Sequence, residues 1–128
     1  MLNAMNSGAK GSLCSLHADS SWEVFNKLAT LAAQSPQHLD FAVTYALAAA
    51  AIDFTVFVQR DRDGHPVVAS IREVSGFDGE RPLTNEIFAC DPDGHAYPTG
   101  VPLSDGRSVA IGEAGFDPRW LASGGGPL

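Results

Sequence analysis

The sequence predicts a mixed α/β fold: a strand and two helices come first, and an antiparallel β-hairpin and a third strand follow. Apolar residues recur at helical spacing between residues 22 and 50, and residues 54–58 and 67–74 then switch to β-branched and aromatic side chains around an Asp-Gly pair. With 128 residues and 45% hydrophobic content, the chain is long enough to bury a core of its own.

The first predicted strand covers residues 12–16, Ser-Leu-Cys-Ser-Leu. The stretch is short and mostly apolar, and Gly11 and the polar run His-Ala-Asp-Ser-Ser bound it, which is typical of a strand buried on both faces. His17 stands at its carboxyl end. Before it, residues 2–6 are expected to be the last turns of a helix that ends at an Asn-Ser-Gly run.

Two helices are predicted next, the first from residue 22 to about residue 34. Ser20 and Glu23 have the spacing of a capping box, in which each side chain accepts a hydrogen bond from the backbone N–H of the other residue. Ser35 followed by Pro36 predicts the cap and start of the second helix. The apolar stripes are expected to be Trp22, Phe25, Leu28, Ala29 and Ala32 in the first helix, and Leu39, Val43, Ala46, Leu47 and Ala50 in the second.

The strands that follow are separated by Asp-Gly turns. Asp63-Gly64 favours a hairpin between residues 54–58 and 67–74, and Asp78-Gly79 leads to a third strand at residues 83–90. Residues 91–128 are rich in Gly, Pro and Asp and are predicted to form a tail, in which only residues 109–121 give a short helix or docked segment. The last residues are expected to fray.

The composition argues against a nucleic-acid partner and against a membrane-spanning helix. The formal charge is −7, the isoelectric point is near 4.8, and the eight Lys and Arg residues are dispersed, so nucleic acid is not expected to bind. The longest apolar run, residues 45–52, is far shorter than the roughly 20 residues that span a bilayer. The start of the sequence does not resemble an export leader, which predicts a cytoplasmic protein.

The sequences DRDGH and DPDGH form an internal repeat that faintly resembles a calcium-binding loop. Such a loop needs a glycine at its sixth position and a glutamate at its twelfth. If Gly64 is placed at the sixth position, the twelfth position is Ser70. If Gly94 is placed at the sixth position, the twelfth is Gly100, so neither repeat has the glutamate. Both repeats are therefore predicted to be turns.

Cys14 with His17 and Cys90 with His95 have spacings that a zinc site with two cysteines and two histidines would allow. Scattered pairs of this kind arise easily, so we favour free thiols that pack as small hydrophobic side chains. The sequence contains no G-x-x-x-x-G-K-[ST] phosphate loop, no G-x-S-x-G and no H-E-x-x-H. It therefore contains no complete catalytic constellation.

The residues around His17 allow two interpretations of this histidine. Open α/β sheets bind ligands at the carboxyl ends of their strands, where an imidazole would donate to a phosphate oxygen. The alternative, which the residue pattern alone favours, is a structural histidine whose ring nitrogens are satisfied at a strand end.

The start of the sequence, MLNAMNSGAKGSLCSLHADS, resembles the histidine box of the secretion ATPases of the type II and type IV superfamily, in particular the tight-adherence pilus branch and its actinobacterial relatives. That family carries M-x-x-A-M-N-[ST]-G-H-x-G-S-[LM] and then [ST]-x-H-A-[ND]-[ST]. Downstream, AIDFTV, EVSGFDG and NEIF are similar to the family's A-[IV]-D-[FL]-x-V, E-V-x-G-x-x-G and [ND]-[ED]-I-F. The motifs occur in the family's order between residue 1 and about residue 88.

The resemblance implies that residues 1–90 are the carboxyl-terminal part of a RecA-like P-loop ATPase domain and that residues 91–128 are its tail. It implies bound ATP and Mg²⁺, with Gly11, Ser12 and His17 at the nucleotide and His17 sensing or stabilising its terminal phosphate. The implied assembly is a hexameric homo-oligomer that works with an inner-membrane platform protein in secretion or pilus assembly. The implied location is the cytoplasm, including the surface of the inner membrane.

The sequence departs from the family at several points, including Ser21-Trp22 where relatives often have Pro-Arg. The P-loop and the acidic boxes are absent from these 128 residues, the first histidine of the box is Ala9, and a later family arginine is Lys27. We therefore expect the chain alone to be inactive. A partial ATPase subunit that needs its P-loop half and a non-enzymatic remnant that acts as an interaction module both stay open.

Overall fold

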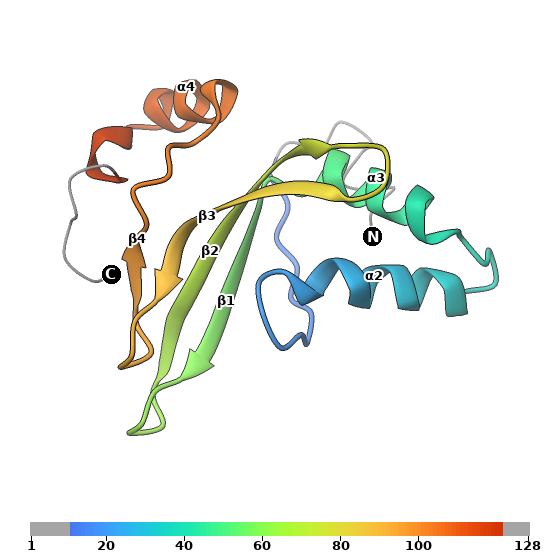
Figure 1. The fold of residues 1–128 in the computed structure, drawn as a ribbon, viewed down its shortest axis with the longest axis horizontal. Coiled ribbons are helices and arrows are strands. Elements are labelled where there is room, and N and C mark those ends of the chain that lie inside the picture. Colours follow the sequence, from blue (N-terminus) through green and yellow to red (C-terminus); the bar gives the residue numbers. More distant parts are fainter. Residues whose placement is uncertain (1–10, 122–128) are drawn as a thin grey trace. The chain divides into compact units, whose positions relative to one another are not determined.

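The computed structural model describes residues 11–121 and has a mixed α/β architecture (Figure 1). In this part of the chain, β1, β2, β3 and β4 form one antiparallel sheet in the order β1-β2-β3-β4. The elements are α2 (Glu23–Gln34), α3 (Phe41–Ala51), β1 (Phe54–Arg60), β2 (Pro66–Phe77), β3 (Pro82–Cys90), β4 (Ala96–Pro98), α4 (Asp105–Glu113) and the 3₁₀ helix η1 (Pro118–Leu121). No helix between residues 11 and 121 is long and apolar enough to cross a membrane. The helix predicted at residues 2–6 lies outside the described residues.

The chain divides into two compact units, and the longer strands run through both. The described part of the first unit comprises residues 11–55 and 74–84, and that of the second comprises residues 56–73 and 85–121. The predicted division into residues 1–90 and a tail stays a prediction.

Helix α2 confirms the first predicted helix and half of its predicted cap. The Ser20 hydroxyl accepts a hydrogen bond from the Glu23 backbone N–H at 3.1 Å. The second bond of the capping box, from the Ser20 backbone N–H to the Glu23 carboxylate, is not formed. The Glu23 carboxylate instead accepts from Asn26 Nδ2 at 3.3 and 3.4 Å. On the predicted stripe, Phe25, Leu28 and Ala29 are buried.

The substitution Ser20→Ala is expected to lower the free energy of unfolding by about 1 kcal/mol, because the Glu23 N–H loses its acceptor. Urea denaturation followed by circular dichroism measures this difference. Ser15→Ala removes an exposed hydroxyl from the preceding segment and is expected to change nothing measurable. Equal midpoints for the Ser20→Ala variant and the unmodified chain would refute a stabilising cap at Ser20.

The second predicted helix exists, but its predicted start at Ser35 and Pro36 is wrong. Both the backbone N–H and the hydroxyl of Ser35 donate to the Ala32 carbonyl, at 3.2 and 2.6 Å, so Ser35 ends α2 and is not free to cap a new helix. Helix α3 begins at Phe41, and Asp40 caps it by accepting from the Ala42 N–H at 2.8 Å.

The buried side of α3 also differs from the predicted stripe. Thr44 and Ala48 are the buried residues, whereas Val43 is 49% exposed and Ala50 is exposed. Thr44 tolerates burial because its hydroxyl donates to the Asp40 carbonyl at 3.0 Å. Almost every residue of α3 is apolar, so hydrophobic periodicity could not select one face.

The core of the first unit joins the two helices to the sheet. Phe25, Leu28, Ala48 and Val74 form its buried cluster. The Trp22 ring meets Phe25 edge to face with ring centroids 5.5 Å apart. The Thr55 hydroxyl also donates to the Ser21 carbonyl at 2.9 Å, which ties the start of β1 to the residues just before α2. Leu16 packs against this cluster and anchors the segment that carries His17.

The two DxDGH repeats are turns, as predicted, and their hydrogen bonds match. Asp61 Oδ1 accepts from the N–H groups of Asp63 and His65 at 2.9 and 2.8 Å. Asp91 Oδ1 accepts from the equivalent N–H groups of Asp93 and His95 at 3.0 and 2.8 Å. The glycines have φ angles of 87° and 95°, in the left-handed region that glycine enters without steric cost. The repeat therefore encodes the same turn twice, between β1 and β2 and between β3 and β4.

The predicted hairpin and third strand are confirmed by β1, β2 and β3, and the short strand β4 was not predicted. In β4, Ala96 pairs with Cys90 of β3, Tyr97 with Ala89 and Pro98 with Phe88. The helix expected within residues 109–121 is found in altered form, as α4 and η1.

Candidate functional site

The predicted strand at residues 12–16 is not formed, and its predicted burial is wrong. These residues have no regular secondary structure and are exposed except for Leu16, and Leu13 is 98% exposed. A strand needs a neighbour for its backbone N–H and C=O groups. None of the four strands in the described part of the chain pairs with this segment.

His17 lies on this extended segment with its side chain exposed. Leu16 fixes the backbone on one side of it, and the Ser20 to Glu23 hydrogen bond fixes it on the other. Within residues 11–121, the ring makes no hydrogen bond or ion pair. It is therefore not the enclosed, hydrogen-bonded histidine of the structural interpretation, and its imidazole can accept or donate a proton toward a ligand.

Gly11 and Ser12, the other predicted nucleotide-binding residues, are exposed on the same segment. Gly11 has a φ angle of 77°, a left-handed conformation that favours glycine. Residues 11–22 contain no lysine or arginine. One imidazole and an exposed backbone are too few groups to hold a triphosphate and Mg²⁺, so ATP binding would need groups beyond this segment.

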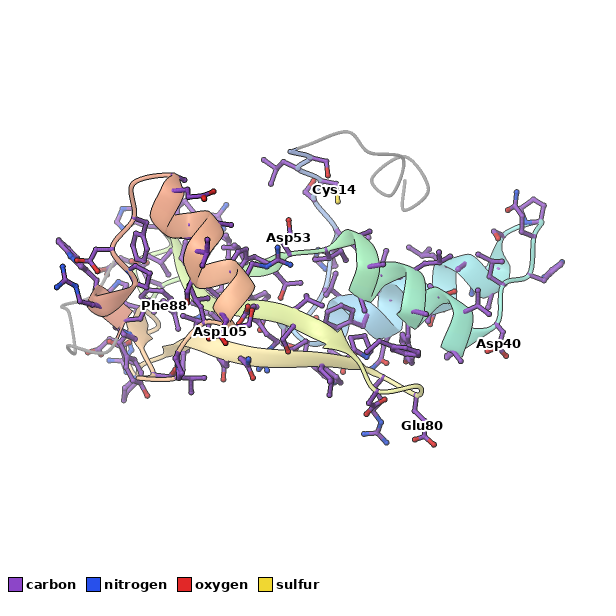
Figure 2. All side chains as sticks on the ribbon, turned by 90° about the horizontal axis from the view of Figure 1, so that it is seen from above. Cys14, Asp40, Asp53, Glu80, Phe88 and Asp105 are labelled. Atoms are coloured by element: carbon purple, nitrogen blue, oxygen red, sulfur yellow. The ribbon has the colours of Figure 1, made fainter. Side chains whose placement is uncertain are left out.

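Cys14 and Cys90 are free, and the expectation that they pack as small hydrophobic residues is wrong. Both are exposed. Figure 2 shows Cys14 on the extended amino-terminal segment, apart from any helix or strand. Cys90 ends β3, where its sulfur donates to the Asp91 carbonyl at 3.3 Å.

One group of side chains in the described residues has the geometry to approach a cation. Asp61, Asp63 and His65 each place one ligand atom within 4.8 Å of the others. Turn formation already accounts for Asp61, since the His65 backbone N–H is the main reason that the Asp61 pKa is lowered. The cluster is thus explained by the turn chemistry that the sequence indicated.

A groove of about 440 Å³ lies in the first unit, between the helices and the β2–β3 turn. Trp22, Phe25 and Tyr45 line it with aromatic rings, and Arg81 contributes a guanidinium that makes no ion pair with a described residue. Glu80, on the same turn, extends away from the ribbon in Figure 2. No sequence motif pointed to this groove, because its residues come from three separate segments.

Glu73 in β2 is a polar centre that sequence reasoning missed. Its side chain is completely buried, and its carboxylate accepts hydrogen bonds from Ser104 and from Asn85 Nδ2, the latter at 3.4 Å. The available signal was a glutamate in the middle of a β-branched, apolar stretch. Nothing in the local pattern revealed that Ser104, 31 residues away, would be its partner.

No protein-family model matches this sequence, and no curated protein matches it at a significant level.

Proposed function

We propose that this chain is the carboxyl-terminal part of a secretion or pilus-assembly ATPase subunit, active only when it is joined to a P-loop half. In this proposal, His17 meets the terminal phosphate of ATP, and Gly11 and Ser12 lie beside it. The observation that carries the proposal is an exposed His17 that has no partner among the described residues. It lies within a histidine-box sequence, and the chain is held on either side of it by Leu16 and by the Ser20–Glu23 hydrogen bond.

Contacts between the downstream motifs support the proposal. Asp53 of the AIDFTV motif accepts, through its carbonyl, a hydrogen bond from the backbone N–H of Val74 at 2.9 Å. Glu73 of the EVSG motif accepts one from Asn85 of the NEIF motif. Motifs that are separated in sequence are thus joined in pairs, as expected if they belong to one ancestral domain.

The extended segment at residues 12–16 gives the P-loop half a place to join. A strand of that half would pair with this backbone and cover Leu13, which is 98% exposed. ATP and Mg²⁺ would then be held mainly by the P-loop half, and His17 would supply one hydrogen bond to the phosphate. The assembly would be a hexamer in the cytoplasm, working against an inner-membrane platform protein.

The polypeptide of residues 1–128, purified on its own, is expected to release no phosphate from ATP above the buffer rate. The sequence contains no phosphate loop, and residues 11–22 offer no cation to the phosphates. A malachite-green assay with and without Mg²⁺ measures this. Magnesium-dependent turnover that disappears in the His17→Ala variant would contradict the expectation.

Exposed apolar side chains favour a second candidate, a non-enzymatic interaction module. Val109 is 62% exposed and Trp120 is 68% exposed, in addition to Leu13. The genomic sequence immediately upstream distinguishes the two: an in-frame P-loop supports the ATPase subunit, and a stop codon without a P-loop supports the module.

A further inference from the structure

We propose that Glu73 is a latch that holds residues 99–104, here called the strap, and through them helix α4, onto the sheet of the second unit. The strap leaves β4 and ends at Ser104, immediately before α4. Asp105, the first residue of α4, is labelled in Figure 2. The proposal is independent of ATP binding, because it concerns contacts within the second unit alone.

The strap is attached to the sheet at its two ends. At its start, the Thr99 N–H donates to the Ile87 carbonyl at 2.9 Å, and the Thr99 hydroxyl donates to the Glu86 carbonyl at 2.7 Å. At its end, the Ser104 N–H donates to both carboxylate oxygens of Glu73 at 3.2 and 3.1 Å, and the Ser104 hydroxyl donates to Oε1. The hydrogen bonds of the second attachment thus all go to one side chain.

The burial of Glu73 depends on the strap in return. The side chain is completely buried, and its partners are the neutral groups of Ser104 and Asn85. No lysine or arginine among residues 11–121 makes an ion pair with it. A carboxylate in such a place is held by its hydrogen bonds alone, and bonds to a charged acceptor are stronger than neutral ones. Losing the Ser104 donors would therefore strongly favour opening of this region.

Helix α4 buries none of its residues fully, and Val109 is 62% exposed. Ser104 is its N-cap residue but makes no side-chain cap, because its hydroxyl is bound to Glu73. Leu103, the strap residue before Ser104, is 7% exposed. The Glu73 contact therefore fixes the residue from which α4 begins.

Hydrogen exchange measured by mass spectrometry on the full chain tests the latch. The Glu73→Gln variant replaces one carboxylate oxygen with an NH₂ group. This group is a donor and cannot accept the hydrogen bonds that the Ser104 N–H and hydroxyl now give to the carboxylate, so the contact with Ser104 weakens. Peptides that cover α4, including the Ser108 N–H that bonds to the Ser104 carbonyl at 2.8 Å, are expected to exchange about tenfold faster. Peptides from α2 are expected to keep their rates.

Glu86→Gln is the matched control, because this glutamate lies on the same sheet and binds Ser70 and Arg72 through its carboxylate, without touching the strap through that group. It is expected to leave α4 exchange unchanged. Ser104→Ala keeps Glu73 and removes one donor, so it should also accelerate α4 and decides the test if Glu73→Gln does not fold.

A double variant distinguishes the loss of one specific contact from a general loss of stability. Glu73→Gln combined with Ser104→Ala is expected to accelerate α4 no more than the stronger single variant, because both changes break one contact. Unchanged α4 exchange in both single variants would overturn the proposal. So would equal acceleration of α2 and α4, or additive effects in the double variant.

Discussion

Replacing Phe25 with alanine is expected to lower the free energy of unfolding by roughly 3–5 kcal/mol. The ring is 1% exposed and packs in the cluster with Leu28, Ala48 and Val74, so its removal loses the burial of an aromatic side chain and leaves a cavity between the helices and the sheet. Urea denaturation of the full chain, with equal slopes for both proteins, measures the difference.

Lys27→Ala is the control for this substitution, because Lys27 is exposed on the same helix. It is expected to change the free energy of unfolding by less than about 0.5 kcal/mol. A similar, small effect for both variants would contradict the packing of α2 against α3 and β2. The partner of α2 would then lie outside this chain.

The two DxDGH turns were predictable because short-range chemistry determines them. An aspartate followed after one residue by Asp-Gly supplies both the side-chain acceptor and the left-handed residue that the turn requires, and β-branched and aromatic runs flank the first of the two turns. The start of α2 was predictable for the same reason, since Ser20 caps a residue three positions away. Signals within about five residues were enough for these elements.

The predictions that failed depended on distant partners or on ambiguous periodicity. Residues 12–16 have the composition of a buried strand, but composition does not supply the neighbour that a strand must pair with. Helix α3 begins after Asp40, which caps it, because the Ser35 hydroxyl is bonded to the end of α2. Strand β4 was missed because its three residues form a strand only by pairing with β3.

The candidate site was only partly accessible from the sequence. The motif selected His17, and the structure adds that its side chain is exposed and that Leu16 anchors its segment. The Glu73 centre could not have been selected, because its partner Ser104 approaches it only after the chain has passed through β3 and β4. Side chains that meet through tertiary structure leave no local spacing to detect.

In an active fusion of a P-loop half from a secretion ATPase to this chain, His17→Ala is expected to reduce the rate of ATP hydrolysis about tenfold or more. This is the scale of one hydrogen bond lost from a transition state. His17 is exposed and packs in no core, so the substitution should not change folding. Equal melting temperatures for the two fusions verify that point.

The most direct test of the proposed function is steady-state ATP hydrolysis by three such fusions: the unmodified chain, His17→Ala and His38→Asn. His38 is a second exposed histidine of the first unit, and asparagine tolerates its φ angle of 46°. The proposal predicts that kcat falls about tenfold or more in His17→Ala alone. Equal kcat values for the unmodified and His17→Ala fusions, or no hydrolysis by any fusion whose P-loop half is intact and folded, would contradict it.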